Sequence, residues 1–282
     1  MSKLPQFATG DGILTVLCDG TDHLPLDLLL NLDRANSAPY LTQALDGRIE
    51  IPINTFLYQT RDRNILIDGG GAGLAPGLGA LPQNLDTMGI TPSQIDTLYC
   101  THLHPDHIGG LLQNGAPVFA NATLRIHHAE PDFWQDTALG ENAPPQFQAM
   151  IDGARAVLDA YAGQIEVFSN GDKIGPGAVA VHLPGHTPGH CGLQLGTAET
   201  AILIWADIVH IAAVQLALPD TSIVFDADPA LAAATRKRLL DQIADTDLHI
   251  AGGHVPGIGQ IQRGPQGFVF RPTVEQATSK RL

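Results

Sequence analysis

The side chains best suited to chemistry in this sequence gather in one short segment, residues 101–110, which reads THLHPDHIGG. Four potential metal ligands lie within six residues of it: His102, His104, Asp106 and His107. Side chains two positions apart on an extended strand point the same way, so the two leading histidines should project together. The proline at position 105 suits the first turn of a helix that would carry the other two ligands. Four such groups around one point suit two divalent ions better than one, so the segment predicts a metal site.

Three later segments contain residues that could complete this site. In LPGHTPGHCG the candidates are His186 and His190, and one of them could serve only packing. Asp207 ends the apolar run AILIWAD, which is typical of a buried strand that delivers a carboxylate, although a helix cap would use the same residue type. His254 follows a strand that ends in two glycines. Their order after the first cluster favours one site assembled from several loops.

The HLHPDH segment, with the histidine and aspartate residues downstream of it, resembles the metallo-β-lactamase-fold hydrolases. That resemblance implies an α+β architecture, an αββα sandwich with a binuclear metal site at one edge of the sheets. It implies the following ligands: His102, His104 and His186 for one ion, and Asp106, His107 and His254 for the other, with Asp207 bridging the two. Asp68, which closes NILID, is implied to support the site without binding metal, and His190 has no ligand role.

Within that superfamily, the sequence most resembles methyl parathion hydrolase and its lactonase-like relatives. The segments THLHPDHIGGL, AEPDFWQ, PGHTPGH, AAVQ and GHVPGIGQIQ carry this resemblance over roughly residues 50–272. It implies an aromatic pocket for the leaving group, with these candidates: Trp134, Phe147 and Phe133. His210 lies three residues beyond Asp207 and could line that pocket or occupy a turn. The segment GAGLAPG, where the pesticide hydrolases have a third aromatic residue, contains none, which argues against efficient turnover of aryl phosphotriesters.

A binuclear site of this kind performs hydrolysis through a hydroxide that bridges two cations, which also polarise the oxygen that becomes negatively charged. Asp106, at the metal edge, is the natural group to shuttle a proton to the leaving oxygen. We therefore expect a metal-dependent hydrolase that opens lactones or cleaves aryl esters, with an organophosphate triester hydrolase as the alternative. A non-catalytic metal-binding module is a third hypothesis, which the complete ligand set disfavours. Zinc is the expected ion because it prefers nitrogen-rich sites, and manganese, iron or cobalt accept similar ligands.

The charge of the chain narrows the class of substrate. The formal net charge is -14, with 15 Lys+Arg against 29 Asp+Glu, so the surface should repel nucleic acid and anionic membranes. Anionic substrates would need clustered basic side chains near the site motifs, and Arg236 and Arg238 are expected on a solvated helix face instead. We therefore expect a small neutral ester-like substrate. The resemblance also allows a homodimer, because relatives are commonly dimers.

The elements that must position these residues are short strands and a few helices, expected in one domain over residues 1–282. Alternating or continuous apolar runs predict these strands: 12–18, 51–60, 64–68, 95–101, 117–120, 123–127, 164–168, 178–183, 192–196 and 201–206. Helical spacing predicts these helices: 77–89, 144–163 and 229–244. Residues 135–146 are rich in turn formers and are expected to form a loop over the site.

The sequence also indicates the cellular compartment in which the protein is expected. Its first residues, MSKLPQFATG, contain neither an apolar stretch nor a small-residue cleavage site, so no signal peptide is visible. No apolar run approaches the roughly 18–20 residues needed to span a bilayer. The three cysteines are widely spaced and odd in number, which favours reduced, buried thiols. A cytoplasmic protein is therefore expected.

Overall fold

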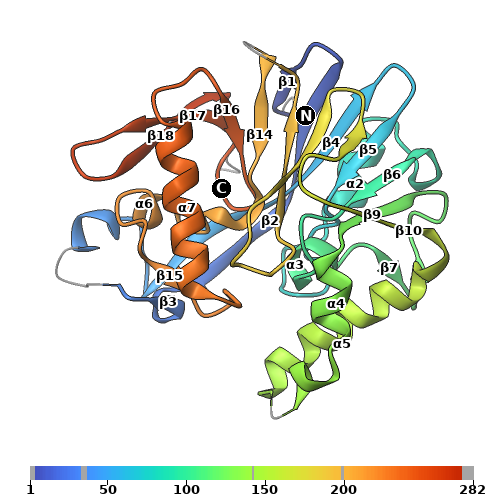
Figure 1. Ribbon diagram of the computed structural model, residues 1–282, viewed down its shortest axis with the longest axis horizontal. Helices are drawn as coiled ribbons and strands as arrows, with labels where there is room; N and C mark the ends of the chain where they lie inside the picture. The colour runs from blue at the N-terminus through green and yellow to red at the C-terminus, as the bar shows by residue number, and fades with distance from the viewer. Residues whose placement is uncertain (1–3, 33–36, 142, 198–199, 275–282) are drawn as a thin grey trace.

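Two seven-stranded sheets pack face to face in the structure, a computed structural model, and helices cover the outer face of each (Figure 1). The structure describes residues 4–32, 37–141, 143–197 and 200–274. The αββα sandwich expected from the sequence is confirmed. The two ends of the expected domain, residues 1–3 and 275–282, lie outside the described residues.

The first sheet comes from the N-terminal half of the chain. Its strands, in spatial order, are β1 (Gln6–Ala8), β2 (Gly12–Pro25), β4 (Arg48–Thr60), β5 (Asn64–Ile67), β6 (Thr97–Tyr99), β9 (Thr123–His127) and β10 (Ile165–Phe168). Pairing is antiparallel from β1 to β5 and parallel from β5 to β10. Parallel neighbours need crossover connections, and helical segments provide them here.

The second sheet comes from the C-terminal half. Its strands, in spatial order, are β11 (Lys173–Gly175), β12 (Ala178–His182), β13 (Cys191–Leu195), β14 (Ile202–Ile204), β16 (His249–Ala251), β17 (Ile258–Arg263) and β18 (Phe268–Val274). Strands β14 and β16 are parallel, and the other neighbours are antiparallel. Two short pairs join β3 (Leu29–Leu30) to β15 (Ser222–Ile223) and β7 (Leu112–Gln113) to β8 (Ala116–Pro117).

The helices lie outside the two sheets. The α-helices are α2 (Leu81–Thr87), α3 (Pro105–Ile108), α4 (Ala129–Gln135), α5 (Pro145–Ala160), α6 (Ala212–Gln215) and α7 (Pro229–Ile243). The 3-10 helices are η1 (Leu26–Leu28), η2 (Ala38–Tyr40), η3 (Pro92–Gln94), η4 (Thr137–Gly140), η5 (Ala162–Gln164) and η7 (Ala206–Ile208). Helices α4 and α5 stand beside the first sheet, and α7 lies across the second (Figure 1). None of the described helices is long and apolar enough to cross a bilayer.

Apolar layers hold the sandwich together. Between the sheets, side chains such as Val16, Phe56 and Leu193 are buried completely or almost so. Fully burying an aliphatic or aromatic side chain of this size contributes about 1.5–3 kcal/mol. A second layer joins the first sheet to α4 and α5, and a third joins the second sheet to α7 through residues such as Leu240. The site at the sheet edge therefore rests on a rigid frame.

Several elements differ from the sequence-based expectations; helix α4 and strand β1, for example, were not expected, and the helix expected at 77–89 is reduced to α2. Strand β2 continues to Pro25, because its second half pairs with β4 and covers an apolar cluster around Ile51. The strand expected at 117–120 is reduced to the end of β8, since Phe119 turns into the core instead. The hairpin of β17 and β18 was not expected, because its strands are half exposed and alternate weakly.

Arg236 corrects the expectation of a solvated face on helix α7. Its side chain is 1% exposed, whereas Arg238 lies on the exposed side of the helix. The guanidinium group donates hydrogen bonds to the carbonyl oxygens of Ile208 (2.6 Å), Thr221 (2.7 Å) and Pro219 (2.8 Å). Helical periodicity did not reveal these acceptors, because they belong to a loop that only tertiary packing brings to the helix.

Candidate metal centre

The site residues stand at the carboxyl ends of parallel strands in both sheets. Asp68 follows β5 and His102 follows β6 shortly after its end, while Asp207 follows β14 and His254 follows β16. The carboxyl ends of parallel neighbours meet at one edge of a sheet, so each pair is brought together. The two sheets face each other, and the two edges therefore share one site.

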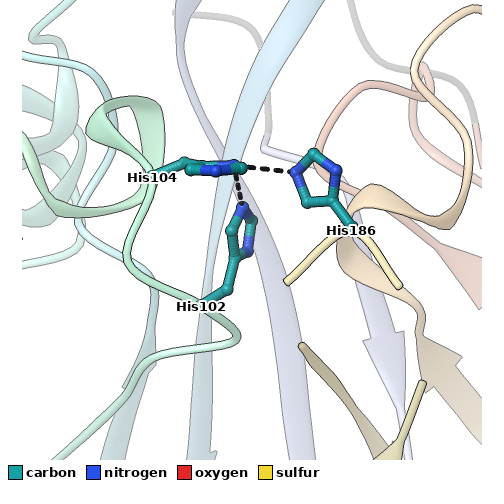
Figure 2. Close-up of side chains that lie close together, drawn as sticks. All are labelled: His102, His104 and His186. Atoms are coloured by element: carbon teal, nitrogen blue, oxygen red, sulfur yellow. Dashed lines mark hydrogen bonds between the residues drawn. The ribbon is translucent and has the colours of Figure 1, made fainter. Parts of the chain in front are cut away.

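The helix expected from the proline in HLHPDH is present. Pro105 is the first residue of α3, and His104 precedes it in an extended conformation. Asp106 and His107 consequently lie in the first turn, next to the two histidines before the helix. His186 lies in the turn between β12 and β13, and its ring points toward those of His102 and His104 (Figure 2).

Three histidine rings converge in the first donor set. The Nδ1 atom of His104 lies 2.8 Å from His186 Nε2 and 3.0 Å from His102 Nε2 (Figure 2). Burial lowers the pKa values of His102 and His104 well below the usual value, so both rings are neutral, as metal binding requires. Three buried ring nitrogens within reach of one ion form a donor set that suits zinc.

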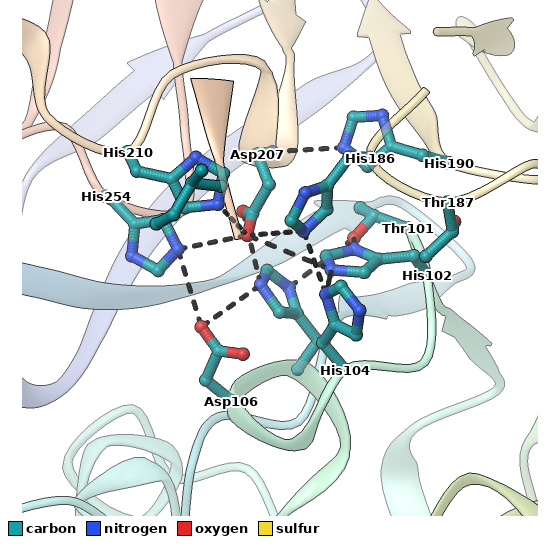
Figure 3. Close-up of polar contacts among 12 residues, drawn as sticks. Thr101, His102, His104, Asp106, His186, Thr187, His190, Asp207, His210 and His254 are labelled. Atoms are coloured by element: carbon teal, nitrogen blue, oxygen red, sulfur yellow. Dashed lines mark hydrogen bonds and ion pairs between the residues drawn. The ribbon is translucent and has the colours of Figure 1, made fainter. Parts of the chain in front are cut away.

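A second donor set lies beside the first. It consists of four residues: Asp106, His107, Asp207 and His254. His107 Nε2 lies 3.2 Å from Asp207 Oδ1. His254 Nε2 lies 3.4 Å from Asp106 Oδ2 (Figure 3). Within the described part of the chain, His107 Nε2 and Asp207 Oδ1 are buried without a hydrogen-bond partner. A cation between them would satisfy both atoms, so the residues present fit a divalent ion.

Asp207 faces both donor sets. Its Oδ2 atom lies 3.0 Å from His254 Nε2, 3.5 Å from His186 Nε2 and 3.8 Å from His102 Nε2. The carboxylate fits there because residue 253 is glycine: a Cβ atom at that position would lie 2.6 Å from Asp207 Oδ1. An aspartate between two donor sets is suited to bridge two cations.

His190 supports this carboxylate from outside both donor sets. Its Nε2 accepts a hydrogen bond from the backbone N–H of Asp207 at 3.1 Å, and its Nδ1 donates to the carbonyl oxygen of Leu183 at 2.8 Å. Burial lowers the pKa of His190 to about 3, so the neutral ring is the stable form. The two histidines of PGHTPGH therefore have different positions, one in a donor set and the other behind it.

Asp68 lies behind the second donor set, in contact with His107. Its carboxylate accepts from His107 Nδ1 at 2.8 Å, and from the backbone N–H and hydroxyl of Thr101 at 2.8 Å and 2.9 Å. Burial opposes a charged His107, but the carboxylates of Asp207, Asp106 and Asp68 outweigh burial and raise its pKa. An acceptor on the far ring nitrogen fixes the orientation of a metal-binding histidine.

Sequence reasoning missed two similar supports. His186 Nδ1 lies 2.8 Å from Asp226 Oδ1, and His254 Nδ1 lies 3.1 Å from the carbonyl oxygen of Pro52. Burial favours the neutral form of Asp226, but the hydrogen bond from His186 lowers its pKa to about 2. No motif marks Asp226; the only available signal was that each histidine ligand needs a partner for its second nitrogen.

A cavity of about 350 Å³ opens onto both donor sets. On one side it is lined by site residues, among them His104, Asp106 and His254. The opposite wall is aliphatic for the most part, with these apolar side chains: Leu24, Leu28, Ile51, Ile53, Met150 and Phe225. Leu74 and Ala75, from the segment that lacks an aromatic residue, also line the cavity, as do Asp22, Pro25 and Pro105. The wall suits a flexible apolar chain better than an aryl ring.

The three aromatic candidates for the pocket lie elsewhere. Trp134 is 3% exposed and packs edge-on against the ring of His104, because its indole N–H reaches a buried acceptor, Glu130 Oε2, at 2.8 Å. Phe133 packs against Trp134, and Phe147 faces the ring of Phe225 with centroids 6.4 Å apart. Among the described residues that line the cavity, Phe225 is the one aromatic side chain apart from histidines.

His210 lies in the cavity lining, one of the two placements considered from the sequence. Its Nε2 is 3.3 Å from Asp207 Oδ2, and its ring stacks on that of His254. The side chain of Gln215 accepts from the backbone N–H of His210 at 2.7 Å and thereby fixes the turn. His210 joins His186 and Asp207 in a third group of close donor atoms, at the boundary between the donor sets and the cavity (Figure 3).

The fold and the donor sets define a class of metal-dependent hydrolases, and the comparisons with known proteins agree. The chain belongs to the metallo-beta-lactamase superfamily, which matches residues 48–254. The resemblance stated from the sequence is thus confirmed, and the protein is a hydrolase of this superfamily.

Two solved structures and two curated relatives are similar to the chain. The hydrolase AbOPH of the beta lactamase superfamily is 29% identical, with a TM-score of 0.88 over 99% of both chains. AidC, a dizinc quorum-quenching lactonase, is 27% identical, with a TM-score of 0.88 over 98% of this chain and 99% of its own. An N-acyl homoserine lactonase of Bacillus cereus is 27% identical over 61% of this chain and 69% of its own. Another N-acyl homoserine lactonase, of Bacillus sp, is 28% identical over 54% of this chain and 61% of its own.

Proposed function

We propose that this protein opens the ring of lactones, with N-acyl homoserine lactones as the substrate class, and that it uses two divalent cations, expected to be zinc. The observation that carries the proposal is the placement of two donor sets at the head of a cavity with an aliphatic wall. Lactonase and dizinc lactonase relatives support the choice of substrate and metal. A neutral substrate also suits a chain with a net charge of -14.

In this proposal the two donor sets divide the cations between them. His102, His104 and His186 would hold one cation, Asp106, His107 and His254 would hold the other, and Asp207 would be shared. The ions would supply a hydroxide nucleophile near neutral pH and polarise the ester carbonyl. The chain's contribution is to hold imidazole rings and ionised carboxylates at fixed positions, so that little reorganisation is needed during the reaction.

Asp106 is the proposed proton carrier. Its side chain is 18% exposed and lines the cavity, whereas Asp207 is almost fully buried at 2%. Burial raises the pKa of Asp106, but His107 and His254 outweigh burial and keep the carboxylate ionised. An ionised carboxylate at the cavity surface can accept a proton from the nucleophile and pass it to the leaving alkoxide oxygen. His210, at the same surface, is placed to orient the lactone.

The aliphatic wall is proposed to hold the acyl chain. Each methylene buried there stabilises the bound substrate by about 0.8 kcal/mol, which is up to about fourfold in kcat/KM. The gain should continue with chain length until the cavity is filled. An aryl ring would find Phe225 as its aromatic partner in the described lining, so aryl esters and aryl phosphotriesters should be poorer substrates.

The test compares substrate classes with one enzyme preparation. Metal-loaded protein is assayed for kcat/KM on homoserine lactones with acyl chains from butanoyl to dodecanoyl, on dihydrocoumarin and on methyl parathion, with a chelator-treated control. The proposal expects chelator-sensitive turnover that increases with acyl length. A preference for methyl parathion would favour the phosphotriesterase alternative. No turnover of any substrate by metal-loaded protein would favour the non-catalytic metal-binding module.

A further inference from the structure

A buried carboxylate that takes no part in these steps lies behind the three histidines. Glu130, in the first turn of α4, has no exposed surface and accepts four hydrogen bonds. Its Oε2 accepts from the backbone N–H of Leu103 at 3.1 Å and from Trp134 Nε1 at 2.8 Å. Its Oε1 accepts from the backbone N–H of Gly189 at 3.1 Å and from the hydroxyl of Thr187. Burial raises the pKa of Glu130, and the four donors oppose that shift because their hydrogen bonds stabilise the carboxylate.

Three of these donors, from Leu103, Thr187 and Gly189, belong to the two loops that carry the three-histidine set, whereas Trp134 lies on α4 itself. Leu103 stands between His102 and His104, and Thr187 immediately follows His186. A single carboxylate therefore joins the loops whose histidine nitrogens lie 2.8 Å apart. Position 189 must be glycine for this approach, because a Cβ atom there would lie 2.7 Å from Glu130 Cγ and 2.8 Å from its backbone nitrogen.

The second donor set has supports of its own. Asp68 holds His107, and the carbonyl oxygen of Pro52 faces His254 Nδ1. The side-chain amide of Asn54 donates to the carbonyl oxygens on either side of His254, at 3.0 Å and 2.8 Å. None of the four hydrogen bonds that Glu130 accepts involves a residue of this set, so its effect should fall on the three-histidine set only.

We propose that Glu130 is a positioning residue that sets the distance between the two histidine loops, and thereby the affinity of the three-histidine set for its cation. It touches neither cation nor substrate; it acts through Leu103, Thr187 and Gly189. The inference rests on the proposed metal site but not on the proposed substrate. In Glu130→Gln the side chain keeps its size, but its NH2 group must face the backbone N–H of either Leu103 or Gly189, and that loop loses a hydrogen bond.

The experiment measures the two cation sites separately. Metal-free wild type and Glu130→Gln are titrated with Zn²⁺ against a chromophoric chelator, and the occupancy of each site is determined in crystals by anomalous scattering. We expect the three-histidine set to bind about tenfold more weakly or worse, as is typical when a partner that orients metal ligands is removed. The affinity of the second donor set for its cation should not change.

Asp19→Asn is the matched control. Asp19 is also fully buried, and its carboxylate accepts three backbone hydrogen bonds, from Gly71 (2.9 Å), Gly79 (3.0 Å) and Leu81 (2.7 Å). It anchors a loop that carries no member of the three-histidine set. This variant should lower the melting temperature of metal-free protein without changing Zn²⁺ affinity at the three histidines. Equal losses of affinity at both cation sites in Glu130→Gln, or in both variants, would show a general folding effect and overturn the proposal.

Thr187→Val keeps the proposal testable if Glu130→Gln does not fold. It removes one of the four donors and leaves the carboxylate in place, so a smaller but selective loss of Zn²⁺ affinity is expected at the same set. Unchanged affinity in the folded variant would overturn the role of Glu130. Lactonase activity is measured separately. If the wild type opens no lactone but Glu130→Gln loses metal selectively, the proposed substrate is wrong and the positioning role of Glu130 stands.

Discussion

The ring of His186 is held between two carboxylates. Its Nδ1 lies 2.8 Å from Asp226 Oδ1, and its Nε2 lies 3.5 Å from Asp207 Oδ2. Burial would lower the pKa of this histidine, but the hydrogen bonds to Asp207 and Asp226 raise it to about 9. One carboxylate thus orients the ring from behind, while the other faces the donor sets.

Removing the rear carboxylate should weaken the site. In Asp226→Ala the Nδ1 atom of His186 loses its acceptor, and we expect metal affinity or kcat/KM to fall about 10- to 100-fold. Metal content after dialysis and kcat/KM provide the measurement. Asp228→Ala is the control: Asp228 caps helix α7 by accepting from Leu231 N at 2.9 Å, so its loss costs about 1 kcal/mol of stability without touching the site. Equal effects of the two substitutions would contradict the role of Asp226.

Asp207→Ala should abolish both metal retention and activity. The substitution removes the carboxylate shared by the donor sets and leaves several buried histidines without their counter-charge. Metal analysis by mass spectrometry and a lactonase assay would show this. Asp220→Ala, which removes only an exposed ion pair with Lys237, should behave as wild type. Two bound metals and full activity in Asp207→Ala would exclude a bridging role.

Phe225→Ala should change the preference for acyl length. Loss of this ring from the cavity wall removes apolar contact with a long chain, so kcat/KM for long acyl lactones should fall about tenfold or more, with little effect on the shortest. Phe133→Ala is the control, because Phe133 packs on Trp134 away from the cavity. A uniform decrease over all chain lengths would place Phe225 outside the chain-binding wall.

Trp134→Ala should act mainly on stability. The side chain is 3% exposed and belongs to the core beside the first sheet, and truncating such a residue costs about 3–5 kcal/mol. Urea unfolding of the metal-free protein would measure that cost, and KM for aryl substrates should change little. A normal stability combined with a raised KM would restore Trp134 to the substrate pocket.

Arg236→Met should destabilise the loop that carries Asp207 and His210. The carbonyl oxygens of Ile208, Pro219 and Thr221 lose the hydrogen bond from Arg236, although that of Thr221 keeps the one from Gln215 Nε2. Hydrogen bonds to charged groups are each worth about 1.5–3 kcal/mol, so a loss of about 3 kcal/mol or more is expected. Arg238→Met, on the exposed face of the same helix, should change the free energy of unfolding by about 0.5 kcal/mol or less. Equal denaturant midpoints for the two variants would contradict this account.

Much of the metal centre could be predicted from the sequence because its geometry is local. The spacing of His102 and His104 on an extended segment and the helix that begins at Pro105 are set by backbone rules that act over a few residues. Asp207 could be placed because an apolar run must end where a buried strand ends. The αββα architecture followed from the resemblance that these motifs carry.

The remaining features depend on contacts between distant parts of the chain. Asp226 meets His186 across 40 residues, and Glu130 meets Gly189 across 59. Arg236 looked like a surface residue because helical periodicity does not reveal what packs against a helix. The three aromatic candidates are not among the residues that line the cavity. Trp134 lies in the core instead, where its indole N–H donates to a buried acceptor. Motif spacing and the family resemblance predicted the donor residues, whereas their orientation and the aliphatic cavity depend on packing, which minimises unsatisfied buried polar groups over the whole molecule.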